Sequence, residues 1–176
     1  PTRTGITPDA SRLFENLGDG TFADRTDSLA GASDTLGSSF IAPLVDLDGD
    51  WRPDLLLTQE FGVSVGHTRV YRNVGKNGEG WITWEERTET SNLERPYGVM
   101  GAAVLELDGD DLPELYLTNL WGESPNREVL FSNRGGMVFE DITSGAGAAA
   151  MSASRNASIS NRTSSWGAVA FDADND

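Results

Sequence analysis

The chain has 176 residues, 28 of them acidic and 13 basic, and a formal net charge of −15 at pH 7. This length suffices for a domain with its own core, and the acidic balance excludes nucleic acid and anionic membrane as expected partners. There is no cysteine and no apolar run of about eighteen residues, so neither a disulfide framework nor a membrane span is expected. Because the chain begins with Pro1 and ends inside a repeat, we interpret it as a piece of a longer or processed protein.

Three short landmarks recur along the chain, and each predicts a β-strand by its apolar and aromatic content. The first reads apolar, aromatic, any residue, Asn; the second is aromatic and acidic and ends in Thr; the third is a run of small and apolar residues. In chain order they are 13–16, 22–26, 41–45, 70–73, 84–88, 101–105, 130–133, 139–143 and 167–171. The self-similarity predicts a repeat architecture.

The segments between the landmarks carry turn chemistry. Glycines at 18–20, at 135–136 and in a longer turn at 75–80 predict hairpins, because glycine tolerates positive φ. Ala42, Ala102 and Ala168 lie four residues before the first acid of the following loop, where a small residue suits close packing of one sheet on the next. The Ala- and Ser-rich stretch 145–160 is interpreted as a surface insertion and the least ordered part.

Each third landmark runs into an acidic loop. The loop 46–54 has acids at positions 1, 3, 5 and 9, the loop 106–114 repeats them, and a third copy starts at 172 without a position 9. The starts lie 60 (106 − 46) and 66 (172 − 106) residues apart. The predicted acidic ligands are Asp46, Asp48, Asp50 and Asp54, then Glu106, Asp108, Asp110 and Glu114, then Asp172, Asp174 and Asp176.

Acids at alternating positions of a tight loop point inward around one centre. Calcium takes six to eight oxygen ligands, and this spacing therefore predicts calcium, with the backbone carbonyl of Arg52 as a further ligand at position 7. The ligand positions hold eleven (4 + 4 + 3) of the 28 acids, so bound cations would neutralise much of the net charge.

Other readings of these acids fit less well. An EF-hand needs a bidentate Glu at position 12, where Leu57 and Leu117 stand in strand-like runs. A glycosidase dyad is unfavoured because repeated acids serve each repeat alike. The lone His67 has no second His or Cys nearby and is interpreted as a surface loop residue, and no G-x-S-x-G motif occurs. We therefore expect no enzyme.

Tryptophan and asparagine supply weaker signals. Trp84 and Trp166 stand at landmarks and are predicted to be core residues, whereas Trp51 and Trp121 stand in or after turns and are candidates for an exposed contact. Asn156 and Asn161 begin N-x-[ST] patterns, which in a Ser-rich insertion arise often by chance.

The landmarks predict an all-β fold built from β-propeller blades of four antiparallel strands. A propeller has about four to eight blades, and this chain supplies about three blade-equivalents, so we expect a partial propeller across 1–176. The expected units are a half blade at 11–26, blades at 37–88 and 97–143, and the start of another at 164–176.

The segments 13–22 and 46–55 resemble FG-GAP/VCBS repeats, the blades of integrin α-like propellers. The first segment is also similar to the ASPIC/UnbV group of cartilage acidic protein-like proteins. The resemblance implies a calcium-stabilised propeller of seven or eight blades that is seldom catalytic. It also implies an extracellular, cell-surface or, in bacteria, periplasmic location.

The resemblance places calcium ligands at positions 1, 3, 5, 7 and 9, which adds the carbonyl of Leu112. Family members usually have Gly at position 6, where this chain has Trp51 and Asp111. Because Glu106 and Glu114 are longer than Asp, weaker calcium binding is expected in their loop. The expected function is protein or glycan recognition; the alternative is a structural subunit of a larger surface or membrane-associated assembly, in which calcium only stabilises.

Overall fold

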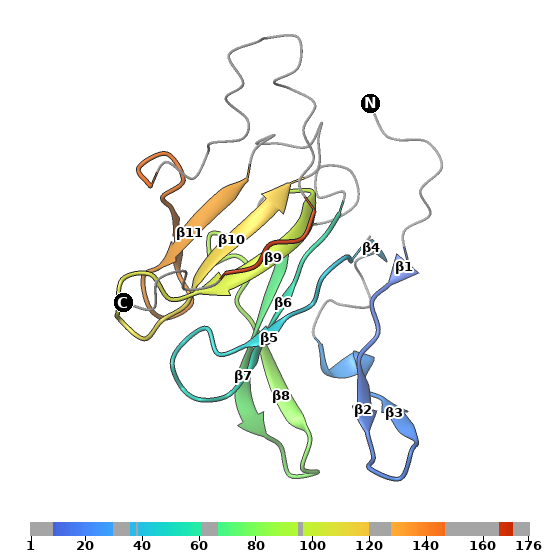
Figure 1. The fold of residues 1–176 in the computed structure, drawn as a ribbon. Coiled ribbons are helices and arrows are strands. Elements are labelled where there is room, and N and C mark those ends of the chain that lie inside the picture. The colour runs from blue at the N-terminus through green and yellow to red at the C-terminus, as the bar shows by residue number, and fades with distance from the viewer. Residues whose placement is uncertain are drawn as a thin grey trace.

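The computed structural model describes residues 9–29, 36–37, 39–60, 67–94, 97–119, 128–146 and 166–170. The described part consists of β-strands and one 3-10 turn, η1 (Thr26–Ser28), which confirms the all-β prediction (Figure 1). The strands are β1 (Asp9–Ala10), β2 (Phe14–Asn16), β3 (Phe22–Asp24), β4 (Leu36–Gly37), β5 (Leu44–Val45), β6 (Asp54–Leu57), β7 (Arg69–Lys76), β8 (Ile82–Glu86), β9 (Val99–Leu105), β10 (Glu114–Asn119), β11 (Val129–Asn133) and β12 (Phe139–Asp141). None of the described residues form a helix of the length and hydropathy that crossing a membrane requires.

Two four-stranded antiparallel sheets form the centre of the fold. The first blade has the order β5-β6-β7-β8 and the second β9-β10-β11-β12, so strands adjacent in sequence are also neighbours in space. A separate hairpin joins β2 to β3, and β1 pairs with β4. Meander sheets of four strands are the blades of a β-propeller, and the chain therefore has the fold of a partial propeller.

The two blades share one strand register. Leu55 of β6 lies opposite Tyr71 of β7, and Leu115 of β10 lies opposite Phe131 of β11. The hairpin β2–β3 repeats the outer half of this pattern, with Asn16 opposite Phe22. The equal register shows that the first and second landmarks form equivalent strands in the hairpin and in both blades.

The core lies between the blades. Leu56 and Val70 on one face of the first blade pack in one cluster with Leu115, Leu117 and other buried residues of the second blade. The opposite face of the first blade forms a smaller cluster, which is made of Leu29, Leu55, Leu57, Tyr71 and Trp84 with Leu13 and Ile82 against it. Burial of each large apolar side chain contributes about 1.5–3 kcal/mol, so stacking of faces is the main stabilisation.

The segment 166–170 runs beside β9 of the second blade and has no assigned strand in the described residues (Figure 1). At their closest approach, a Cβ on Gly101 would lie 2.8 Å from Gly167 N and 2.9 Å from Gly167 Cα. A small residue is therefore needed one position before Ala102, the position expected from the sequence. The contact packs the segment 166–170 directly against β9.

We expect Gly101→Ala to destabilise the protein by about 1–3 kcal/mol, because the added methyl group would push against backbone atoms that cannot rotate away. Urea unfolding followed by fluorescence measures the change. Ala103→Gly in the same strand is the matched control for strand propensity. Equal stability of Gly101→Ala and the parent would contradict the close contact.

The two tryptophans predicted to be core residues differ in burial. Trp84 is buried, as predicted, with 8% of its surface exposed. The prediction that Trp166 is a core residue is wrong, since 65% of its surface is exposed. Its ring meets Phe40 edge-on at 6.0 Å, and Phe40 is itself 44% exposed, so this pair lies at the margin of the stacked sheets. Trp121, both N-x-[ST] patterns, nearly all of 145–160 and the loop 172–176 lie outside the described residues.

Candidate metal centre

Each of the two described acidic loops connects the first strand of its blade to the second. The ninth residue anchors the loop from within: the buried Asp54 accepts the Leu47 N–H at 2.9 Å with Oδ2 and the Asn73 N–H at 2.8 Å with Oδ1. Glu114 accepts the Leu107 N–H at 2.9 Å in the same way. Asp54 therefore ties the start of the first loop to strand β7.

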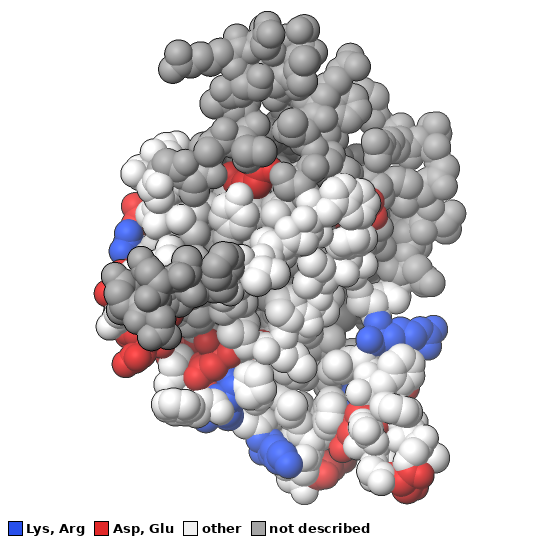
Figure 2. Space-filling model, viewed as in Figure 1, with Lys and Arg blue, Asp and Glu red and all other residues white. Residues whose placement is uncertain are grey.

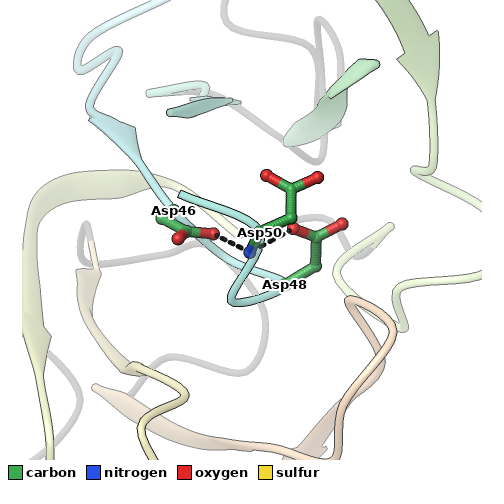
Figure 3. A group of neighbouring side chains, drawn as sticks. All are labelled: Asp46, Asp48 and Asp50. Atoms are coloured by element: carbon green, nitrogen blue, oxygen red, sulfur yellow. Dashed lines mark hydrogen bonds between the residues drawn. The ribbon is translucent and has the colours of Figure 1, made fainter. Parts of the chain in front are cut away.

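The first acid closes the loop upon itself. Asp46 Oδ1 accepts the N–H groups of Gly49 at 2.8 Å and Asp50 at 3.1 Å, and Oδ2 accepts that of Trp51 at 2.6 Å. Figure 3 shows the Asp50 N–H between the carboxylates of Asp46 and Asp48. These backbone donors hold the Asp46 carboxylate inside the turn.

The sixth position of both loops has a left-handed backbone. Trp51 has φ 65° and Asp111 has φ 66°, the region that favours glycine. Glycine suits this position because it has no Cβ, whereas Trp51 and Asp111 hold a side chain on a backbone conformation that disfavours one. Trp51 is also 93% exposed, so its side chain gains almost nothing from burial, and the prediction of an exposed Trp51 is confirmed.

We expect Trp51→Gly to be more stable than Trp51→Ala by about 1 kcal/mol, because only glycine relieves the Cβ–carbonyl clash of the left-handed backbone. Both variants remove the same exposed ring, so the Ala variant is the control for its loss. Thermal unfolding of both in the same buffer measures the difference. Identical melting temperatures would show that the loop stores no strain at this position.

The loops gather oxygen atoms as a hard cation requires. Three carboxylate oxygens lie within 4.8 Å of one another, one each from Asp46, Asp48 and Asp50. The second loop brings together the set Glu106, Asp108 and Glu114 by the same measure. Neither set contains nitrogen or sulfur, and donor sets of this chemistry fit calcium.

The remaining predicted ligands stand apart from these groups. Asp54 is absent from the first oxygen group and Asp110 from the second. The carbonyl groups of Arg52 and Leu112 stay predicted ligands. Asp172, Asp174 and Asp176 lie outside the described residues.

Two arginine side chains pair with acids of the first loop, and the sequence pattern predicted a site role for neither side chain. Arg72 of β7 donates to Asp48 Oδ2 from Nε at 2.5 Å and to Asp50 Oδ2 from Nη2 at 3.2 Å. Arg52 also pairs with Asp50 Oδ2, and its Nε donates to the Asn73 carbonyl at 2.9 Å. The sequence did contain a hint of the Arg72 contact. Arg72 directly precedes the landmark residue Asn73, on the strand that pairs with the strand leaving the loop.

Burial raises the pKa of the Asp54 carboxyl from its ordinary value of 3.8 to about 6. The N–H groups of Asn73 and Leu47 oppose the rise, and the charges of Asp48 and Asp50 add to it. Burial likewise raises the pKa of Glu114. Protons therefore compete with a bound cation at the Asp54 carboxyl group near pH 6 and below, and at Glu114 at a higher pH than at an ordinary glutamate.

We expect the protein in chelator to lose stability as pH rises from about 4 to about 6. The folded state holds a proton on Asp54 that the unfolded chain releases at lower pH, so the contribution is present below the unfolded pKa and is lost through the folded pKa. Melting in EDTA at half-unit pH steps measures it. Asp54→Asn, which cannot ionise, is the control, and a parent curve with the same slope would contradict the assignment.

A groove of about 750 Å³ lies between the two loops, with Trp51 at its rim and Leu112 and Pro113 in its lining. Carboxylates from both loops line it as well: Asp46, Asp48, Glu106, Asp110 and Asp111. Figure 2 shows acidic atoms gathered on the side of the molecule where the loops lie, with basic atoms beside them. The exposed His67 lies elsewhere, in a second pocket with Arg69 and Glu86.

A comparison with protein families finds an FG-GAP-like repeat at residues 46–117. The match runs from the first residue of the first loop to Leu117 in β10, and so contains both described acidic loops. A search of curated proteins finds no match. The narrower similarity to the ASPIC/UnbV group stays an expectation. The family match and the two equal blades lead to one conclusion: residues 46–117 are similar to an FG-GAP-like repeat, in a chain with the fold of a partial β-propeller.

Proposed function

We propose that this protein is a calcium-binding β-propeller module, extracellular or on the cell surface, that recognises a protein or glycan and catalyses no reaction. The observation that carries the proposal is the oxygen-only carboxylate cluster, present in each of the two described blades at equivalent places. FG-GAP repeats occur typically in extracellular domains, are generally non-enzymatic and often bind calcium, which supports the location, the lack of catalysis and the metal.

Isothermal titration tests the metal. Calcium should bind with higher affinity than magnesium, because magnesium demands a near-octahedral shell that flexible carboxylate loops do not enforce. Asp48→Ala should abolish binding at the first loop. Asp27→Ala, outside the loops, is the matched control. If Asp48→Ala still binds calcium at as many sites and as tightly as the parent, the assignment of this loop is refuted.

The groove between the loops supports recognition. An aromatic ring exposed over 93% of its surface beside a concave, acidic surface offers stacking for a sugar ring or an anchor for a protein side chain. A glycan array and a protein pull-down with the calcium-loaded protein test both ligand classes. Trp51→Ala should lose captured ligand, while Trp166→Ala, which alters an exposed ring outside the groove, should retain it.

A specific observation also favours the alternative of a structural subunit. Phe14 and Phe22 of the β2–β3 hairpin are 51% and 63% exposed. Their equivalents in the two blades are buried, and these are Tyr71, Trp84, Phe131 and Phe139. The hairpin therefore exposes a face that the fold elsewhere covers with another blade. Sedimentation of the parent and of a Phe14→Ser, Phe22→Ser variant tests this: parent assemblies that the variant lacks would favour the structural role.

A further inference from the structure

The two loops share their acids and differ in their counter-charges. Arg72 precedes Asn73 as Ser132 precedes Asn133, and Arg52 precedes Pro53 as Leu112 precedes Pro113. The first loop therefore has a guanidinium group at two positions where the second loop has neutral side chains. Among the described residues, the ion pairs to loop acids all involve Asp48 or Asp50 of the first loop.

The guanidinium of Arg72 bridges two carboxylates. It donates to Asp48 and to Asp50 at once, and the acceptor atoms belong to the side chains that form the predicted calcium cluster. These side chains are shielded, with 7% of Asp48 and 19% of Asp50 exposed, so the pairing acts at a lower effective dielectric than at an open surface. A planar fork across two acids is the geometry that arginine satisfies and lysine does not.

The acids of the second loop have no arginine partner among the described ion pairs. It carries five carboxylates, with Asp111 as the fifth, and all except Glu114 are exposed. Its loop backbone is closed by hydrogen bonds to Glu106 and Glu114, as the first is by those to Asp46 and Asp54. The two loops thus have similar turn geometry and a different demand for an external cation.

We propose that Arg72 and Arg52 are built-in counter-cations of the first loop, so that the loop 106–114 is the tighter calcium site and the loop 46–54 binds calcium only in competition with these guanidinium groups. This rests on the calcium binding proposed above. Two cationic groups beside the site repel a divalent ion, and a single one at about 5 Å lowers affinity on the order of tenfold even at the dielectric constant of water. The order is the reverse of that expected from the longer Glu side chains alone.

The test resolves the loops separately. Gly49 and Gly109 occupy the same position in their loops, with φ 78° and 79°, so their amide signals in ¹H–¹⁵N spectra report on each site. Calcium chloride is titrated into the parent protein and into Arg72→Ser, which installs the side chain of the second blade. Arg52→Leu makes the same exchange at position 7, and Arg12→Ser, whose partner is Asp24, controls for net charge.

In the parent, Gly109 should reach half-saturation at a lower calcium concentration than Gly49. Arg72→Ser should lower the midpoint of Gly49 about tenfold and leave that of Gly109 unchanged, while Arg12→Ser moves neither. If Arg72→Ser does not fold without calcium, Arg52→Leu, at a site 42% exposed, gives the same comparison.

An unchanged or raised Gly49 midpoint in both variants would overturn the inference while leaving calcium binding intact, because the arginines would then hold the ligands in place. If neither glycine amide signal shifts at any calcium concentration, the proposed calcium binding itself is overturned. Melting in EDTA is the independent readout: Arg72→Ser should be less stable than the parent without metal and regain stability with calcium. Equal melting of the two in EDTA would also count against the counter-cation role.

Discussion

Removing calcium should lower the melting temperature of the protein by about 5–10 °C. Binding to the folded state alone adds about 2.7 kcal/mol when the free ion exceeds Kd a hundredfold, and 1 kcal/mol shifts the midpoint of a chain of this size by about 2–4 °C. Without the ion, carboxylates a few ångströms apart repel by about 1 kcal/mol per pair even at the dielectric constant of water. The paired arginines reduce this repulsion in the first loop, so the loss should arise mainly in the second.

Differential scanning calorimetry of the protein with calcium and with EDTA measures the shift. Magnesium in place of calcium is the control and should restore less than half of the lost stability, since it fits the loops poorly. Acidification with calcium present should lower the melting temperature as ligands protonate. A melting temperature indifferent to both chelator and calcium would show that the loops are solvated acidic turns with no structural metal.

Asp54→Ala should destabilise the protein by about 3 kcal/mol. The carboxylate is buried and accepts N–H bonds from Leu47 and Asn73, and each bond to a charged group is worth about 1.5–3 kcal/mol. The alanine variant leaves both buried donors without an acceptor. Part of the loss is offset because the carboxyl group no longer has to be buried, which is the cause of its raised pKa.

Asp54→Asn is the matched variant for this position. Its single side-chain oxygen retains one of the two acceptors, so urea unfolding in EDTA should place its stability between those of the parent and the alanine variant. Asp50→Ala removes a carboxylate of the same loop that is partly exposed, and its effect in EDTA should be smaller. An alanine variant as stable as the parent would mean that Asp54 does not tie the loop to β7.

Most of the fold could be read from the chain because each blade is specified by contacts close in sequence. The apolar and aromatic residues in 70–73 and 130–133 predicted β7 and β11, and glycines at 18–20 and 135–136 predicted tight turns that the structure confirms with positive φ. The acidic loops were also predictable, since ligand positions in one short turn are set by local geometry. Glycine at position 6 in the family likewise pointed to the left-handed backbone of Trp51 and Asp111.

What the sequence determined by itself is the repeat, the strands within each blade and the carboxylates that line each loop. Only the tertiary structure decided that Arg72 pairs with two acids of the first loop, that Gly101 touches Gly167 and that Trp166 stays exposed. These features depend on which strand lies beside a loop and which face stacks on the next sheet. These contacts are between residues far apart in the chain. A sequence repeat predicts the same role for equivalent positions, even where the residues around them in space differ.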